Sequence, residues 1–437
     1  MSAFVFRQTI DDCSCGKIHR CPIREVKIGA DILGEIPGHL QGIVHVLLVF
    51  DENTRAACGE TVRRILRAAG IAVTAVCLPP EREGAAVLPD EDSIAKIRGG
   101  LTEQTGCIVG VSSGVINDLC KYVSFFAGLP YMIVATAPSM DGYASKDAAM
   151  ILGGMKETVP ARCPAYIFAD TDVLREAPLR MIRAGAGDIL GKYSCLNDWR
   201  LSQLINGEEL CEEIFAMTLR EAGLTAENAR GINARESGAV SSLMNSLIAV
   251  GAAMAYAGCS RPASGSEHHL AHYFEITGIL RRAPYLFHGE DVAFGAVLTA
   301  RLREWLLSRT PADFRPCESP EALRARRDAV YGRISESVSR LQEQAGLDDP
   351  SSRLPVIRAR WDKVLAVLRT ALPSERILEA LDQLGLSFGA FVRFYGKERL
   401  REAIVSARDL KNRYTLLNLL ADTGLLTEAA DAVLSDL

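Results

Sequence analysis

The stretch VHVLLVFD, residues 44–51, decides the fold, because it is an almost unbroken apolar run that stops at an acidic residue. Such a run is typical of a strand that is buried on both faces of a parallel sheet. Helical apolar spacing follows over residues 54–69, and a short helix is expected at 93–98. Further strand-like apolar runs occupy residues 71–77, 107–111, 131–137 and 165–170. This alternation predicts an α/β domain whose parallel sheet is covered on both faces.

After Asp172 the strand pattern ends, and segments with helical apolar spacing continue to Leu437. The helical pattern is expected to break at Gly223, Gly258, Pro284, Pro350 and Pro373. A chain of 437 residues also exceeds the size of a single hydrophobic core. We therefore expect two domains, an α/β domain over residues 1–173 and an all-α domain over residues 174–437.

Composition and charge narrow the functional class. With 48% hydrophobic and 24% charged residues the chain is an ordinary globular protein, and its net charge of −5 argues against a nucleic-acid partner. The N-terminus has no charged-then-apolar signal pattern. Residues 237–260 carry no charge, but serines and an asparagine interrupt them, so we expect a buried helix and no membrane span. Twelve scattered cysteines indicate reduced thiols and a cytoplasmic protein.

The segment CSCGKIHRC, residues 13–21, gathers potential metal ligands at Cys13, Cys15, His19 and Cys21. Cysteine and histidine are both zinc-ligand types, but their spacing here matches no common zinc motif. A bound metal and a packed N-terminal turn both stay open as interpretations of this segment.

The segment GVSSGVINDLCKY, residues 110–122, turns from the third predicted strand directly into a helix. Its small residues Ser112, Ser113 and Gly114 leave room for backbone amides to approach a phosphate at the helix N-terminus. Because the G-x-G-x-x-G pattern is absent, a plain tight turn is an equal alternative. Asp51, at the end of the first strand, has two compatible roles, as a hydrogen-bond acceptor for ribose hydroxyls and as an N-cap.

Two further segments carry carboxylates in suggestive places. ATAPSMDGYASKDAAM follows the fourth predicted strand, and ligands of open α/β sheets bind at the carboxyl ends of strands. Thr136 and Ser139 are candidate nucleotide contacts there, and Asp141 is either a ligand contact or an N-cap. Asp188, in MIRAGAGDILGKYS, precedes a helical segment, and by its spacing alone it is an N-cap.

Histidines concentrate in residues 265–295, which hold four of the seven in the chain. They are His268, His269, His272 and His288. His268 and His272 are four residues apart and therefore share one face of a helix. His288 begins a second apolar-periodic segment. Two histidines on facing helix ends, with one carboxylate, would form an open three-ligand metal site, and hydrogen-bonded interface histidines are the alternative.

Five motifs in this order resemble the glycerol-1-phosphate dehydrogenases, which belong to the iron-containing alcohol dehydrogenase and dehydroquinate synthase superfamily. The motifs are GVSSGVINDLCKY, SMDGYAS, GAGDILGKY, EHHLAHYFE and HGEDVAFG. The segments CGKIH and RDLKNRYTLLNLL resemble the bacterial branch of that family. The resemblance implies a dehydroquinate synthase-like fold, in which a Rossmann-like dinucleotide-binding domain joins a helical metal- and substrate-binding domain. It also implies that both substrates bind in the cleft between the domains.

The resemblance further implies roles for individual residues. Asp188, His268 and His288 match the ligands of one divalent metal, which is zinc, nickel or iron. His272 and Asp141 match residues near the reacting atoms and are the catalytic candidates. Where the family often has three glycines, this chain has Ser112, Ser113 and Gly114, which narrows the space for a pyrophosphate. The implied cofactor-binding set is Asp51, Gly110, Ser112, Ser113, Gly114, Asp118, Thr136 and Ser139.

The implied activity is the reversible reduction of dihydroxyacetone phosphate to sn-glycerol 1-phosphate by a homodimer. NAD(H) should be preferred over NADP(H), because the Asp51 carboxylate would repel a 2′-phosphate. Candidates for the substrate phosphate are Lys192 first, Lys146 second and Arg413 as a more distant third. Alternatives are a glycerol dehydrogenase, a dehydroquinate synthase-like lyase, and a non-catalytic protein that binds nucleotide and metal.

Overall fold

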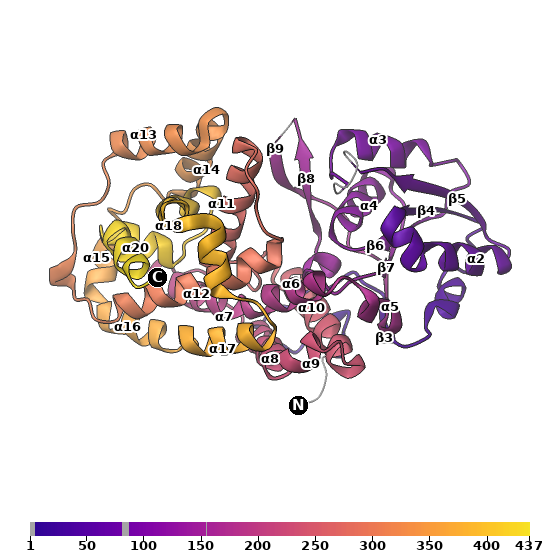
Figure 1. The fold of residues 1–437 in the computed structure, drawn as a ribbon, viewed down its shortest axis with the longest axis horizontal. Helices are drawn as coiled ribbons and strands as arrows, with labels where there is room; N and C mark the ends of the chain where they lie inside the picture. The colour runs from indigo at the N-terminus through magenta and orange to yellow at the C-terminus, as the bar shows by residue number, and fades with distance from the viewer. Residues whose placement is uncertain (1–4, 81–86, 154) are drawn as a thin grey trace. The chain divides into compact units, whose positions relative to one another are not determined.

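A computed structural model describes residues 5–80, 87–153 and 155–437. Among these residues, six strands form one sheet in the order β3-β10-β7-β6-β4-β5, and all neighbouring strands run parallel (Figure 1). The strands are β3 (Glu25–Gly29), β4 (His45–Asp51), β5 (Ala72–Leu78), β6 (Cys107–Ser112), β7 (Tyr131–Ala135) and β10 (Tyr166–Asp170). The predicted parallel α/β architecture is confirmed.

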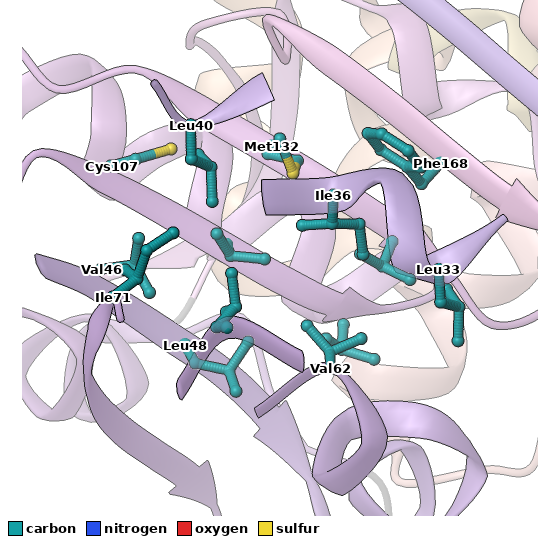
Figure 2. Close-up of a cluster of buried hydrophobic side chains, with 14 of the residues drawn as sticks. Leu33, Ile36, Leu40, Val46, Leu48, Val62, Ile71, Cys107, Met132 and Phe168 are labelled. Atoms are coloured by element: carbon teal, nitrogen blue, oxygen red, sulfur yellow. The ribbon is translucent and has the colours of Figure 1, made fainter. Parts of the chain in front are cut away.

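One face of this sheet packs against η1 (Leu33–His39) and α2 (Glu60–Ala68). Alternate residues of β4 point to this side, and Val46 and Leu48 join Ile36 and Val62 in a single buried cluster (Figure 2). Because strand side chains alternate between faces, Leu47 is directed to the opposite side. The stretch that decides the fold is therefore buried on both faces, as its apolar run predicts.

The opposite face is covered by α3 (Glu91–Gly99) and α4 (Gly114–Ala127), which contact the strands β4 to β7. A Cβ atom placed on Gly100, just after α3, would lie 2.7 Å from Leu47 Cδ1. This close approach confirms that Leu47 is directed to the face that α3 covers. The sheet is therefore covered by helices on both faces.

Five strands, one at the sheet edge and four in two hairpins, were not expected from the sequence. β3 forms the sheet edge beside β10, and its residues Glu25 and Lys27 interrupt the apolar pattern. β8 (Asp147–Leu152) and β9 (Met155–Pro160) form an antiparallel hairpin, and so do the short strands β1 (Thr9–Ile10) and β2 (His19–Arg20). Short or half-exposed strands lack the long apolar run on which the prediction depended.

Helices make up nearly all of the rest of the chain, as predicted. They are α5 (Thr171–Glu176), α6 (Leu179–Leu190), α7 (Lys192–Asn206), α8 (Glu212–Glu227), α9 (Ala229–Asn233), α10 (Ser237–Ala257), α11 (Ser266–Arg281), α12 (His288–Leu306), α13 (Pro320–Tyr331), α14 (Ser335–Ala345), α15 (Arg353–Ala359), α16 (Trp361–Arg369), α17 (Ser374–Gln383), α18 (Phe388–Ser406), α19 (Leu416–Asp422) and α20 (Leu426–Ser435). Pro284, Pro350 and Pro373 lie outside helices, and Gly258 caps α10 with a φ of 68°. The break expected at Gly223 is wrong, because Gly223 lies inside α8.

The charge-free segment forms α10, whose mean hydropathy reaches 1.5 over an 18-residue window. Within the described ranges it is the one helix that is long and apolar enough to cross a bilayer, but 67% of that window is buried inside the structure. It packs against α5, β3 and the short helix η3 (Gly142–Ala144). The expectation of a buried core helix is confirmed.

The chain packs into two compact units. The first consists of Met1–Ala186 and Asn228–Cys259, and the second of Gly187–Glu227 and Ser260–Leu437. The helices α9 and α10 therefore belong to the unit that contains the sheet. The division into a dinucleotide-binding domain over residues 1–173 and a metal- and substrate-binding domain over 174–437 stays a prediction about function.

Candidate functional site

Three predicted metal ligands lie together in the second unit. Asp188 comes from α6, His268 from the first turn of α11, and His288 is the first residue of α12. Their ligand atoms all lie within 4.8 Å of one another, and the two imidazole rings are 5.1 Å apart between centroids. The spacing suits one metal ion with three protein ligands and at least one open position.

Two glycines let the three helices approach closely enough for this convergence. A Cβ atom on Gly187 would lie 2.5 Å from the carbonyl oxygen of Gly289, at the start of α12. A Cβ atom on Gly295 would lie 2.8 Å from the carbonyl oxygen of Glu267, next to His268. Since real Cβ atoms do not approach backbone so closely, these positions exclude any larger residue. Glycine next to each ligand-bearing segment thus fixes the distances between the ligands.

Asp188 is fully buried and its charge is balanced by Lys192, one helical turn further along the chain. The Lys192 ammonium donates to Asp188 Oδ1 at 2.7 Å and to the carbonyl oxygen of Ala263 at 3.0 Å. Burial acts to raise the pKa of Asp188, but the charge of Lys192 and the contact with His268 outweigh it and hold the pKa below its usual value. Asp188 is therefore ionised, as a metal ligand must be.

His268 is oriented by the carboxylate that precedes it. His268 Nδ1 lies 2.7 Å from Glu267 Oε1, and His268 Nε2 lies 3.5 Å from Asp188 Oδ1. Burial and Lys192 act to lower the pKa of His268, but its contacts with Asp188 and Glu267 outweigh them and raise it. A proton on Nδ1 leaves the Nε2 lone pair directed at the cluster, which is the usual arrangement of metal-bound histidines. The donor set therefore fits a divalent metal.

The structure also resolves which of the neighbouring histidines faces the cluster. The His272 ring lies 6.3 Å from that of His268 and 5.3 Å from that of His288, so it borders the three ligands. His269 is fully buried elsewhere, and burial followed by the charge of Arg413 holds its pKa well below the usual value. The ligand pair therefore begins at His268, as expected, and His269 is a neutral core residue.

The three candidates for the substrate phosphate are all engaged with protein acceptors. Lys192 holds Asp188, and Lys146 Nζ donates to the carbonyl oxygen of Gly258 at 3.1 Å. The Arg413 guanidinium donates to the Ser264 carbonyl oxygen at 3.1 Å. Lys192 is also completely buried, whereas Lys146 is exposed. The structure thus supports a role for Lys192 in positioning a metal ligand, and its predicted contact with phosphate stays a prediction.

The predicted nucleotide-binding residues lie in the first unit, along the carboxyl edge of the sheet. From β4 the chain moves outward to β5 and then returns to β6 on the other side of β4, so the strand order reverses between β4 and β6. Ligands of open α/β sheets bind at such a reversal. Asp51 ends β4, and Ser112 ends β6 just before α4. The topology therefore brings the predicted adenosine and pyrophosphate residues to the same edge of the sheet.

Individual members of this set have visible structural roles. Asp51 Oδ1 accepts a hydrogen bond from the Thr54 N–H at 2.8 Å, so the N-cap role is confirmed. Asp118 pairs with Lys121 at 2.9 Å and accepts from the Ala149 N–H at 3.2 Å. Gly110 lies inside β6, since the strand continues to Ser112, one residue beyond its expected end. Their predicted contacts with a cofactor stay predictions.

The remaining residues of the set lie at the ends of β6 and β7. The N–H of Thr136 donates to the Ser112 carbonyl oxygen at 2.9 Å, which joins the two strand ends. Ser113 is the N-cap residue of α4 but its side chain makes no capping hydrogen bond, and a Cβ atom on Gly114 would meet only Met140, at 3.8 Å. Asp141 is the N-cap residue of η3 without a capping bond from its side chain. The turn before α4 therefore has room beside Gly114, and its contact with a pyrophosphate stays a prediction.

Comparison with known proteins shows the family to which the chain belongs. Residues 28–178 match the iron-containing alcohol dehydrogenase family. A glycerol-1-phosphate dehydrogenase [NAD(P)+] of Halalkalibacterium halodurans is 34% identical over 68% of this chain and 75% of its own length. The chain belongs to the iron-containing alcohol dehydrogenase family. A second relative, the glycerol-1-phosphate dehydrogenase [NAD(P)+] of Bacillus licheniformis, is 27% identical over 96% of this chain and 94% of its own.

Solved structures of iron-containing alcohol dehydrogenases share the fold. The enzyme from Thermococcus thioreducens superimposes with a TM-score of 0.64 at 12% identity, over 95% of this chain and 99% of that one. Glycerol dehydrogenase from Schizosaccharomyces pombe gives a TM-score of 0.59 at 16% identity, over 95% of this chain and 91% of that one. The predicted fold class is confirmed, and the chain is an oxidoreductase of this family.

Two carboxylates that support the Asp188–His268–His288 cluster were not predicted from the sequence. Glu267 contacts His268 although adjacent helical residues rarely face each other, so spacing gave no signal for the pair. Asp198 accepts from the N–H groups of Ser266 at 2.6 Å and Leu416 at 2.7 Å. Burial, with the charge of Glu267, raises the pKa of Asp198 to about 7. Its partners are remote in sequence, so only the fold reveals that it holds the start of α11.

Proposed function

We propose that the protein is a glycerol-1-phosphate dehydrogenase that interconverts dihydroxyacetone phosphate and sn-glycerol 1-phosphate with NAD(H). The observation that carries the proposal is the Asp188–His268–His288 cluster, which lies in a chain 34% identical to a glycerol-1-phosphate dehydrogenase. In the reducing direction the ketone, NADH and one proton give the alcohol and NAD⁺. We place the activity in a cytoplasmic homodimer.

A divalent zinc, nickel or iron ion held by Asp188, His268 and His288 would supply Lewis-acid polarisation of the ketone. The chain contributes a preset ligand geometry. Glu267 keeps the Nε2 atom of His268 directed at the cluster, and Lys192 keeps Asp188 ionised before an ion binds. Because these side chains already have the orientation that a metal ion needs, little of the free energy of metal binding is lost in ordering them.

Proton transfer to the new alkoxide is assigned to His272, which borders the cluster, and to Asp141. The His272 imidazole is half-buried and borders both ligand histidines, so one of its ring nitrogens can carry a proton near the substrate oxygen. Asp141, on the loop after β7, is the second proposed catalytic residue and is proposed to contact the substrate hydroxyl. Both residues match the family motifs that carry these roles.

The nicotinamide supplies the hydride, and the proposed dinucleotide site is the crevice between β4 and β6. Support comes from the reversal of strand order there and from the roomy turn at Ser113 and Gly114 before α4. The backbone N–H groups at the start of a helix of this length favour an anionic pyrophosphate. The carboxylate of Asp51 is proposed to accept hydrogen bonds from the adenosine ribose.

The test is an NADH-oxidation assay with four compounds, with the metal content measured on the same preparation. The compounds are dihydroxyacetone phosphate, dihydroxyacetone, glycerol with NAD⁺, and a heptulosonate phosphate. We expect turnover of dihydroxyacetone phosphate with about one divalent metal per chain in the cluster. A stereospecific glycerol-3-phosphate dehydrogenase should leave the product unoxidised, because the product is the sn-1 isomer.

Each alternative predicts a different result in the same assay. Turnover of only dihydroxyacetone and glycerol would indicate a glycerol dehydrogenase. Cyclisation of the heptulosonate phosphate without net NADH consumption would indicate a lyase of the dehydroquinate synthase type. NADH binding without turnover of any compound would contradict an enzymatic role.

A further inference from the structure

The N-terminal strands β1 and β2 form a short antiparallel ribbon, in which Ile10 pairs with His19. The connection turns sharply at Gly16, whose φ is 76°, and the Gly16 N–H donates to the Cys13 carbonyl oxygen at 2.9 Å. Such a φ favours glycine. The turn brings together the side chains of Cys13, Cys15 and His19, whose ligand atoms lie within 4.8 Å of one another.

We propose that this ribbon is a second metal site, in which the thiolates of Cys13 and Cys15 and the Nε2 atom of His19 bind a structural zinc ion. Zinc–sulfur bonds of about 2.3 Å and zinc–nitrogen bonds of about 2.0 Å in a tetrahedron place neighbouring ligand atoms about 3.5–3.8 Å apart. The ligand atoms of Cys13, Cys15 and His19 lie within 4.8 Å of one another, which is close to that range. Only small side-chain rotations are needed to reach it.

The histidine of this site is already oriented as a ligand. His19 is buried, and its Nδ1 atom lies 2.8 Å from the carbonyl oxygen of Tyr256. A carbonyl oxygen only accepts, so Nδ1 carries the proton and Nε2 carries the lone pair. His19 Nε2 lies 3.1 Å from Cys15 Sγ, so this lone pair is directed at the thiols. A backbone carbonyl that fixes the tautomer is typical of zinc-binding histidines.

The ligand chemistry separates this site from the Asp188–His268–His288 cluster. Two thiolates and an imidazole are soft donors that select zinc, whereas the other cluster offers oxygen and nitrogen only. Cys21, the fourth residue of the sequence motif, is buried and lies outside the cluster. Tetrahedral zinc takes a fourth donor besides these three. The proposal is consistent with a fourth donor that is sulfur, which gives three bound sulfur atoms, and with one that is not, which gives two.

The position of the site indicates what the ion does. Tyr256 lies at the end of α10. Its carbonyl oxygen accepts a hydrogen bond from His19 Nδ1, and its hydroxyl donates to the Arg7 carbonyl oxygen. An ion on His19 therefore fixes the ribbon to the end of α10. Both thiols lose their protons on binding, so zinc affinity should rise with pH.

The test is cobalt substitution of the full-length protein. Wild type should show the near-ultraviolet thiolate-to-cobalt charge-transfer band, which the oxygen and nitrogen ligands of the other cluster do not produce. A Cys13→Ser, Cys15→Ser double variant should lose this band and about one zinc per chain. The Cys259→Ser variant changes an exposed cysteine outside the cluster and should keep both the band and the zinc. His288→Ala should keep the band, although it should lose the metal of the other cluster.

Three results would overturn the proposal. They are a wild-type spectrum without the band, a double variant that retains it, and a disulfide between Cys13 and Cys15 in freshly purified protein. If the double variant does not fold, X-ray absorption at the zinc edge of wild type decides. Sulfur neighbours at about 2.3 Å support the site, and a spectrum with only nitrogen and oxygen neighbours contradicts it.

Discussion

His268 and His269 are adjacent, yet His268 belongs to the Asp188–His268–His288 cluster and His269 is buried outside it. The sequence predicted the correct member of the pair through the H-x3-H spacing and the family motif. It did not predict the contact of Glu267 with His268 or that of Lys192 with Asp188. These partners balance charge inside the site, and charge balance depends on burial, which a sequence does not show.

The first prediction at this scale concerns His288. His288→Ala should lose bound metal and reduce kcat/KM by more than about 100-fold, while circular dichroism stays unchanged, because the residue is half-buried at the start of α12. His272→Ala is the control, since it borders the cluster without belonging to it and should retain the metal. Full metal occupancy and activity in His288→Ala would refute the ligand assignment.

The second prediction concerns Asp51 and the choice of nucleotide. Asp51→Ser keeps an N-cap acceptor for the Thr54 N–H but removes the charge, so it should raise the preference for NADPH over NADH by about 1–2 kcal/mol. Asp51→Gly removes both the N-cap acceptor and the charge, so it should relax the preference for NADH and lower the stability of the fold. The measurement is the ratio of kcat/KM for the two nucleotides. A wild type that uses both nucleotides equally well contradicts this role.

The third prediction concerns the substrate phosphate. The residue that binds it should, when neutralised, weaken transition-state binding of dihydroxyacetone phosphate by about 1.5–3 kcal/mol and that of dihydroxyacetone much less. We compare kcat/KM for both ketones in Lys192→Met and Lys146→Met. Lys192 also bonds Asp188, so the metal content of each variant must be matched to wild type first. Unchanged discrimination in both variants would place the phosphate elsewhere.

At the scale of elements, the strands that the sequence predicts are those with long apolar runs, such as β4 and β7. The edge strand β3 was not predicted because Glu25 and Lys27 give it a mixed pattern. The β8–β9 hairpin was not predicted because the start of β8 was assigned to the loop segment ATAPSMDGYASKDAAM. Gly223 was expected to end a helix but lies within α8, where its neighbours supply enough packing to override its low helix propensity. Tertiary contacts decided each of these cases.

Close approach of α11 and α12 leads to the fourth prediction. Gly295→Ala would place a Cβ atom 2.8 Å from the Glu267 carbonyl oxygen, so it should destabilise the fold by about 1–3 kcal/mol and weaken metal binding. Gly223→Ala is the matched control in the same unit, because its nearest atom is Tyr193 Oη at 3.9 Å. The control should be neutral or stabilise by about 0.5–1 kcal/mol. Denaturant unfolding and metal titration measure both effects, and equal stabilities would contradict the packing argument.

At the scale of the whole molecule, the two units carry different proposed ligands. Asp188, His268 and His288 all belong to the second unit, and the sheet with the proposed nucleotide site belongs to the first. The fifth prediction is that metal bound at this cluster stabilises the second unit locally, by about 2.7 kcal/mol when free metal is 100 times Kd. Hydrogen exchange should accelerate in α11 and α12 after chelation, and β4, β6 and β7 should exchange as before. A uniform change through both units would contradict it.

The interleaving of the two units has a consequence for synthesis of the chain. A ribosome adds roughly 5–20 residues per second, and all six strands of the sheet have been made once Asp170 is added. The apolar helix α10, which packs on β3 and α5, begins only at Ser237, after α7 and α8 of the other unit. The apolar surface that α10 later covers therefore stays exposed on the nascent sheet for several seconds. Chaperones bind surfaces of this kind. Recombinant production of the first unit by itself accordingly requires residues 228–259 joined behind residue 186.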